Sequence, residues 1–175
     1  MPVPLRLRIL KNLTASLETV THEYTPEEGE ARPAVSMIGK VFRGRTVFGD
    51  SDPLPMFSIL EAPIPVDQIP TEGDNTGNKG IWELLIQGFV EEDHLHPTDP
   101  AHYLLAECKA RLAWEKARNS DFDILGLGKH VLDIEIGPGV VRPPDEISAK
   151  AYFWLNVSLT LAEDLLKPYE VRTKG

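Results

Sequence analysis

The densest group of side chains that could do chemistry lies at residues 91–102. It holds three imidazoles and four carboxylates: His94, His96, His102, Glu91, Glu92, Asp93 and Asp99. Imidazoles and carboxylates bind zinc and other divalent cations, and Glu91 or Glu92 could act beside such a metal as a general base. Polar residues also gather in an ordinary solvated connection before a helix, and a His-x-His spacing is no specific metal signature. We favour the solvated connection and keep a small metal-dependent cytoplasmic enzyme as an alternative.

The remaining motifs give catalysis little support. Cys108 is the only cysteine, and it lies on an apolar helical stripe, where a buried and unreactive thiol is expected. The glycine pairs at residues 126–128 and 137–139 lack the continuation of a phosphate-binding loop, and no Gly-x-Ser-x-Gly sequence marks a nucleophilic serine. We therefore predict that the protein is not an enzyme and uses no cofactor or metal.

Two other features are typical of contact surfaces. Arg43 and Arg45 place two guanidinium groups around a glycine. This arrangement is suited to binding carboxylates or phosphates of a partner, but two ordinary surface arginines would give the same sequence. Tyr152 and Trp154 fall on the nominally polar face of a long predicted strand, so either this chain or another chain must cover them. Because aromatic residues are enriched at interfaces, we expect a contact surface here.

The size and charge of the chain narrow the function classes. It has 175 residues and a mass of 19.5 kDa, so we expect residues 1–175 to form one domain. The 18 Lys and Arg against 27 Asp and Glu give a net charge of -9, which argues against broad binding of duplex nucleic acid. No apolar run approaches the roughly 20 residues of a membrane-spanning helix. The first residues carry no secretory pattern, so we expect synthesis to end in the cytoplasm.

Helical periodicity appears in two places. Leu10, Leu13, Leu17 and Val20 recur at spacings of three and four, which predicts a helix within residues 5–20. A second helix begins at Asp99 and Pro100, with Asp99 as the expected N-cap, and its apolar stripe is Ala101, Leu104, Leu105, Cys108 and Leu112. The glutamate-rich stretch 21–32 between the first helix and the next apolar segment predicts a loop.

The other apolar segments favour strands. Residues 33–49 and 56–61 are rich in Val, Ile and Phe and bounded by Gly, Asp and Pro, and these two segments could pair. Residues 81–90 are apolar on both faces, as in a central strand. Alternation predicts a half-buried strand at 131–136, with Asp133 and Glu135 on its polar face, and a long strand at 149–161. Residues 71–80 lack large apolar side chains, so we expect a mobile surface loop there.

This order predicts an α+β fold, with a mainly antiparallel sheet and two principal helices packed on one face. Several segments together resemble the tail terminator, or tail completion, proteins of long-tailed bacteriophages, among which the lambda-type minor tail protein U is the best known. The segments are the N-terminal helix, the Arg-Gly-Arg strand with residues 52–63, the strand 82–90, the helix start at 96–107 and the alternating strand ending near Pro168. The resemblance covers most of the chain, whereas residues 63–80 look like an insertion.

The resemblance implies a structural virion protein. Such a subunit closes into a ring, a hexamer in the family, on the last ring of the tail tube, ends tube polymerisation and meets the connector of the head. A head-tail adaptor, or neck protein, of the same virion is an alternative that shares the fold. Both would be assembled in the host cytoplasm and located at the head-tail junction, with no membrane contact.

On this reading we expect DNA to pass through the lumen of the ring without specific binding. Asp133 and Glu135 are the candidate lumen residues, because an acidic wall repels the phosphates of DNA. The candidate contacts with the neighbouring copy, the tube or the connector are Phe42, Arg43, Arg45, Asn75, Asn78, Tyr152 and Trp154.

Overall fold

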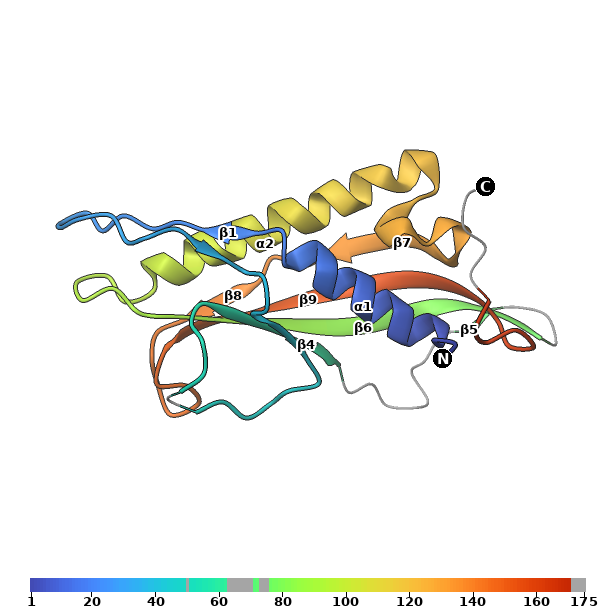
Figure 1. Cartoon of the computed structure of the whole chain (residues 1–175), viewed down its shortest axis with the longest axis horizontal. Helices are drawn as coiled ribbons and strands as arrows, with labels where there is room; N and C mark the ends of the chain where they lie inside the picture. Colours follow the sequence, from blue (N-terminus) through green and yellow to red (C-terminus); the bar gives the residue numbers. More distant parts are fainter. Residues whose placement is uncertain (50, 63–70, 73–75, 171–175) are drawn as a thin grey trace.

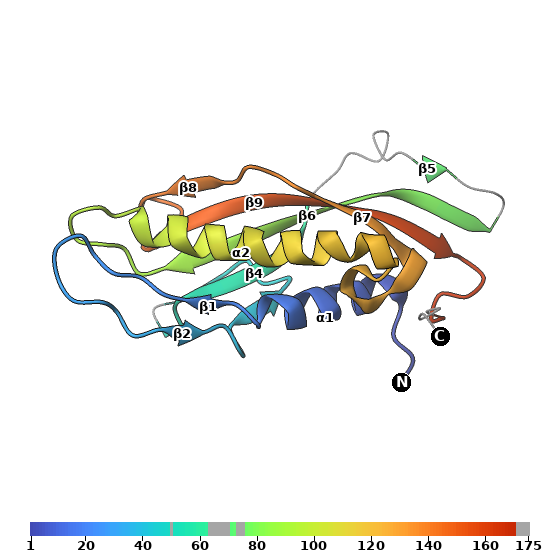
Figure 2. The same cartoon turned by 90° about the horizontal axis from the view of Figure 1, so that it is seen from above.

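The chain folds into two layers, a twisted sheet and a pair of helices that lie on one of its faces (Figures 1 and 2). The computed structural model describes residues 1–49, 51–62, 71–72 and 76–170, with only the backbone described at 71–72. This arrangement confirms the predicted α+β class with a mainly antiparallel sheet. Neither long helix in these ranges has the length and apolar character needed to cross a membrane.

Helix α1 (Leu5–Leu17) confirms the first predicted helix, although it ends three residues earlier than the periodicity suggested. Its buried apolar side chains recur at every fourth position: Leu5, Ile9, Leu13 and Leu17. Residues that are four apart lie on the same side of a helix. The stripe therefore faces the sheet and packs into the main core.

The segment after α1 is more regular than its composition indicated. Strand β1 (Thr21–His22) pairs with β2 (Val35–Ser36) as a separate two-stranded sheet, so the loop spans residues 23–34 instead of the predicted 21–32. Strand β3 (Val41–Arg43) is much shorter than the predicted 33–49 strand, and it pairs with β4 (Met56–Glu61) in parallel. The predicted strand was too long because its apolar residues are divided between two sheets. Some lie in β2 of the small sheet, some in β3 of the main sheet, and the rest in segments that form no strand.

Two long strands form the centre of the main sheet. Strand β6 (Gly77–Val90) runs antiparallel to β9 (Ala151–Asp164) in an unbroken register from Gly77 opposite Asp164 to Val90 opposite Ala151. Both predicted strands are confirmed and both are longer than expected. Strand β5 (Thr71–Glu72) pairs with Gly80 and Lys79 of β6. The prediction of a mobile loop at 71–80 was therefore wrong where the structure describes it, because backbone pairing needs no large apolar side chain.

Helix α2 (Asp99–Ala117) confirms the second predicted helix and its buried stripe. Its N-cap is Thr98, and not Asp99, because the Thr98 carbonyl accepts the N–H groups of Ala101 and His102 at 3.1 and 3.2 Å. The helix packs on β6, β7 (Val131–Ile136) and β9. Strands β7 and β8 (Val140–Arg142) occupy successive stretches of the same edge of β9.

The main core fills the space between the helices and the sheet. Alternate residues of β9 point into it: Ala151, Phe153, Leu155, Val157, Leu159 and Leu161. A second, smaller cluster lies on the opposite face, where Met56, Phe89 and Tyr152 are buried. Side chains of a strand alternate between faces, so the other residues of β6 and β9 line this second face, which we call the far face.

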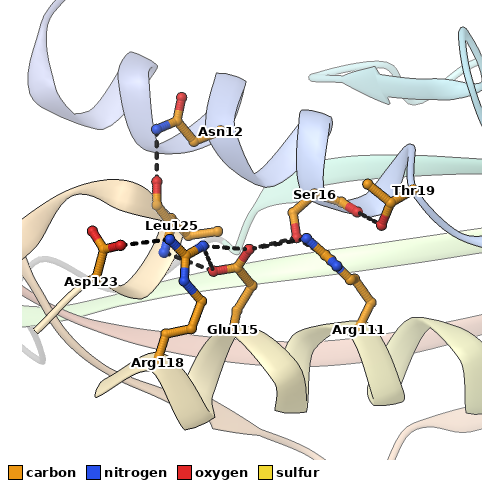
Figure 3. A network of polar contacts seen from close by, with 8 residues as sticks. All are labelled: Asn12, Ser16, Thr19, Arg111, Glu115, Arg118, Asp123 and Leu125. Carbon is orange, nitrogen blue, oxygen red and sulfur yellow. Dashed lines mark hydrogen bonds and ion pairs between the residues drawn. The ribbon is translucent and has the colours of Figure 1, made fainter. Parts of the chain in front are cut away.

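A buried carboxylate joins the two helices (Figure 3). Glu115 of α2 is 2% exposed, and it accepts hydrogen bonds from the Ser16 hydroxyl of α1 at 2.9 Å and from the Leu125 N–H at 2.8 Å. Arg118 lies 3.1 Å from its second oxygen, and Arg111 donates to the Ser16 hydroxyl at 2.8 Å. The charge of Glu115 is thus satisfied where water is excluded, as a buried charge requires.

Candidate functional site

The far face divides into two halves along the strands. Cross-strand register places Phe89, Tyr152 and Arg142 in one row, and Glu83, Ser158 and Glu135 in another. The first row belongs to an aromatic half, which residues 44–49 and 51–54 cover; we call these residues the covering segment. The second row belongs to an open half, which neither α1 nor α2 covers, because both of these helices pack on the other face.

The open half is acidic and rich in hydroxyl groups. Glu83 accepts a 2.7 Å hydrogen bond from the Ser158 hydroxyl. Asp133 lies opposite Thr160 and Glu135 opposite Ser158, so the predicted polar face of the 131–136 strand joins this surface. Sequence reasoning missed Glu83, because residues 81–90 were taken as apolar on both faces.

One lysine partly neutralises the two carboxylates of β7. The Lys116 ammonium of α2 lies 3.2 Å from Asp133 Oδ1 and 3.3 Å from Glu135 Oε1, and it donates to the Ile134 carbonyl at 2.7 Å. Burial is the largest single influence and acts to raise the pKa of Asp133. The hydrogen bonds with Lys116, Glu135 and the Ile134 backbone, together with the charge of Lys116, outweigh it, so the pKa of Asp133 is lowered. Glu135 remains 70% exposed. Neither predicted lumen residue is buried, and strand alternation places both on the far face, where the Lys116 side chain of α2 still reaches them.

The aromatic half corrects part of the predicted interface. Tyr152 is only 1% exposed and packs against Phe89 and Trp154, so this chain itself covers it. Its hydroxyl donates to Asp145 Oδ2 at 2.8 Å, and burial together with this bond raises the pKa of Tyr152. Tyr152 is therefore a core residue and has no surface to offer a partner.

The arginine pair is divided between two environments. Arg45 is bound to Asp52 within the covering segment, and its guanidinium carbon lies 4.9 Å from the Phe42 ring centre and 5.1 Å from that of Phe48. Within this chain Arg45 holds the covering segment over the aromatic half, and its contact with a partner stays a prediction. Arg43 is exposed, and its guanidinium makes no hydrogen bond or ion pair with the residues described. Phe42 is half-buried at the border of the aromatic half.

The remaining predicted contact residues lie apart from this cluster. Asn78 is half-buried in β6, where it faces Glu163 of β9. Asn75 lies outside the described residues. Trp154 is half-buried and borders a cavity between the covering segment and residues 147–150.

The structure does not assemble a metal centre from the histidine cluster. Across the described ranges, no group of three or more His, Cys, Asp or Glu side chains is arranged to hold a metal ion. His94 and His102 are exposed, and the His96 imidazole lies 3.3 Å from Glu27 instead. Burial raises the pKa of the Cys108 thiol to about 12, which suits an unreactive core residue.

Asp93 has a structural role in the same connection. Its carboxylate accepts hydrogen bonds from the Tyr24 hydroxyl at 2.6 Å and from the N–H groups of Leu95 and His96 at 2.8 and 2.9 Å. These bonds, the one from Tyr24 foremost, hold the pKa of Asp93 at about 2. Such a carboxylate is a poor general base near neutral pH. Asp93 instead connects the 23–34 loop to the residues just before α2.

The buried residue His22, on β1 next to this loop, should make the stability of the folded chain depend on pH. Its imidazole is 4% exposed, and neither ring nitrogen has a hydrogen-bond partner among the described residues. Burial, and secondarily the charge of Arg32, lowers the pKa of His22 below 6.5. As the pH falls below 6.5, the unfolded chain binds a proton that the folded chain does not, so stability decreases.

Urea unfolding at pH 7.5 and at pH 5.5 measures this loss of stability. We expect the His22→Gln variant to lose less stability than the wild type over this interval, since it has no imidazole to protonate. The exposed residue His102 supplies the matched control, and His102→Gln is expected to retain the wild-type pH dependence. An unchanged dependence in His22→Gln would show that His22 is not the group responsible.

Comparison with known proteins identifies no family for this chain. No protein-family model matches it, and no curated protein matches it significantly.

Proposed function

We propose that this protein is a virion subunit that forms a ring on the tail tube of a long-tailed bacteriophage and ends tube growth. The ring has the open half of the far face turned toward its lumen. The observation that carries the proposal is the charge of that half, where Glu83, Asp133 and Glu135 lie and where Lys116 is the one described cation paired with the last two of them. The α+β fold implied by the resemblance to tail terminators is also the fold of this chain.

An acidic wall suits a passage for DNA. Like charges repel the phosphates, so the duplex does not adhere, while hydroxyl groups such as those of Ser158 and Thr160 keep the wall hydrated. The net charge of -9 acts in the same direction over the whole subunit. The partners in this proposal are further copies of the chain, the tail tube protein and the connector of the head.

A tube-growth assay tests the capping role. Purified protein added to polymerising tail tubes is expected to arrest their elongation and to shorten the tube-length distribution. The arrest should persist in the double variant Glu83→Lys and Glu135→Lys, since these residues line the lumen and make no contact with the tube.

Infectivity tests the acidic lumen separately. Virions assembled with the double lysine variant should release DNA more slowly and give a lower titre than wild type. The matched control reverses two exposed charges elsewhere, Glu28→Lys and Glu107→Lys, and should retain the titre. Tubes that grow unchecked in the presence of wild-type protein would contradict the proposed capping role. Equal titres of the two double variants would contradict the proposed acidic lumen.

A further inference from the structure

Residues 21–36, which we call the arm, are attached to the rest of the molecule by few buried side chains. Strands β1 and β2 form a sheet separate from the main one, and the 23–34 loop that joins them projects beyond the N-terminal end of α2 (Figures 1 and 2). Within the arm, all of which the structure describes, only His22 and Tyr24 are buried. A segment with so few buried contacts opens locally at a lower free energy than the whole fold.

The contact at Tyr24 does not change with pH near neutrality. The Tyr24 hydroxyl donates to the Asp93 carboxylate at 2.6 Å, and the Tyr24 ring centre lies 5.6 Å from that of Tyr103. Hydrogen bonds, the one from Tyr24 foremost, hold the pKa of Asp93 at about 2, and burial raises the pKa of Tyr24 above its usual value. Both groups therefore keep the same charge from about pH 5 to pH 8, the range in which an ordinary histidine titrates.

The contacts of Arg32 are equally independent of pH. Its guanidinium donates to the carbonyls of Glu91 and Glu92 at 2.8 and 2.7 Å, and its backbone N–H donates to the Tyr24 carbonyl at 2.9 Å. A guanidinium stays charged and a backbone carbonyl does not titrate. These bonds hold the loop against the residues just before α2 at neutral and at mildly acidic pH alike.

His22 is the group of the arm that acid disturbs. Its side chain is 4% exposed, and neither ring nitrogen has a hydrogen-bond partner among the described residues. A proton on this ring creates a buried charge without an acceptor, and the Arg32 cation repels it further. When the arm is open, water surrounds the ring, which then binds a proton with an ordinary pKa near 6.5. Acid therefore favours the open arm.

The ionisable groups around His22 offer it no other partner. Strand β1 lies between the hydrogen bond of Ser16 with Arg111 and the ring contact of Tyr24 with Tyr103, so residues 103–111 of α2 flank it. Strand β2 carries no ionisable side chain. The ionisable residues on the flanking segments make no hydrogen bond to the imidazole; they are Glu18, Glu23, Tyr103, Glu107, Cys108, Lys109 and Arg111.

A second histidine acts in the opposite direction. The His96 imidazole lies 3.3 Å from Glu27 of the loop, and protonation of His96 strengthens this contact. Both side chains are well exposed, at 48% and 75%, so the pair contributes little. Acid does not release the arm through His96, which leaves His22 as the group that can do so.

We propose that residues 21–36 form an acid-released arm, which opens from α2 when His22 is protonated while both helices and the main sheet stay folded. Tyr24 and Arg32 hold the arm closed at neutral pH, and His22 sets the pH range in which it opens. The arm contacts α2, on the side of the sheet opposite the open half, so its release does not depend on the proposed function.

Amide hydrogen exchange resolved to single residues tests the arm. Rates measured at pH 7.5 and pH 5.5, each divided by the rate of an unstructured peptide at the same pH, give the opening equilibrium of each segment. The Arg32 N–H, bonded to the Tyr24 carbonyl, reports on the arm, and the paired amides of β6 and β9 report on the whole fold. At both pH values the Arg32 amide should exchange faster than those of β6 and β9.

The opening equilibrium of the arm should rise about tenfold from pH 7.5 to pH 5.5, the change for one group that titrates near 6.5 only in the open arm. His22→Gln and His22→Leu both remove the imidazole and should abolish this rise. His22→Leu also keeps the buried site apolar, so it guards against an effect of the polar amide. His102→Gln, at an exposed position of α2, is the matched control and should retain the tenfold rise.

Three results would overturn the proposal. Exchange of the Arg32 amide no faster than that of β6 and β9 would show that the arm opens only when the whole chain unfolds. The same opening equilibrium at both pH values in the wild type would show that acid does not release the arm. A tenfold rise that persists in both His22 variants would assign the effect to another group.

Discussion

Replacing Glu115 with alanine is expected to lower the free energy of unfolding by about 3–5 kcal/mol, the usual cost of removing one partner from a buried ion pair. The change leaves the Leu125 N–H and the Ser16 hydroxyl without their acceptor, and it leaves Arg118 paired with Asp123 alone. It also removes the polar link between α1 and α2 shown in Figure 3. Urea unfolding followed by circular dichroism measures the loss.

Two further variants separate the charge from the side chain. Glu115→Gln keeps the size of the side chain and one acceptor oxygen, so its loss should lie between those of wild type and Glu115→Ala. Glu107→Ala alters an exposed glutamate of the same helix and should change stability little. A Glu115→Ala protein as stable as Glu107→Ala would show that the network contributes nothing.

Replacing Gly88 with valine is expected to cost about 3 kcal/mol or more, at the upper end of overpacking effects. Gly88 lies opposite Phe153 in the register of β6 and β9. A Cβ atom at residue 88 would lie 2.1 Å from Phe153 Cε1, and Phe153 is fully buried. The ring occupies the space that the missing side chain leaves, so any larger residue displaces it.

A double-mutant cycle tests this cause directly. Phe153→Leu shortens the side chain that meets residue 88, so the cost of Gly88→Val should be smaller in the Phe153→Leu background. Gly49→Ala is the control, because nothing lies within 4 Å of a Cβ atom there. Equal costs of Gly88→Val in both backgrounds would exclude the contact with Phe153 as the cause.

The sequence predicted the elements whose periodicity is long. The alternation of residues 149–161 identified β9 and the face that enters the core, and the stripe from Ala101 to Leu112 identified the buried side of α2. Short strands were harder, because β1, β2 and β5 have only two residues each and show no period. Their existence depends on backbone partners that are distant in the sequence.

The candidate site was predicted in part. Alternation placed Asp133 and Glu135 together, whereas Glu83 joined them only through the register of β6 with β9. Tyr152 and Arg45 were candidate contacts with a partner, because no pattern revealed that residues 44–49 and 51–54 cover the aromatic half. Glu115 showed no signal either, since a buried glutamate looks like any other charged residue of a helix until its partners are known.

The proposed function requires that copies of this chain form a ring at the end of a tail tube. The most direct measurement combines light scattering with negative-stain images of the protein alone and mixed with its tail tubes. We predict ring-shaped particles seated at one end of each tube, and a mass in that mixture that corresponds to several copies per cap. A protein that stays monomeric and leaves both tube ends bare would contradict the claim.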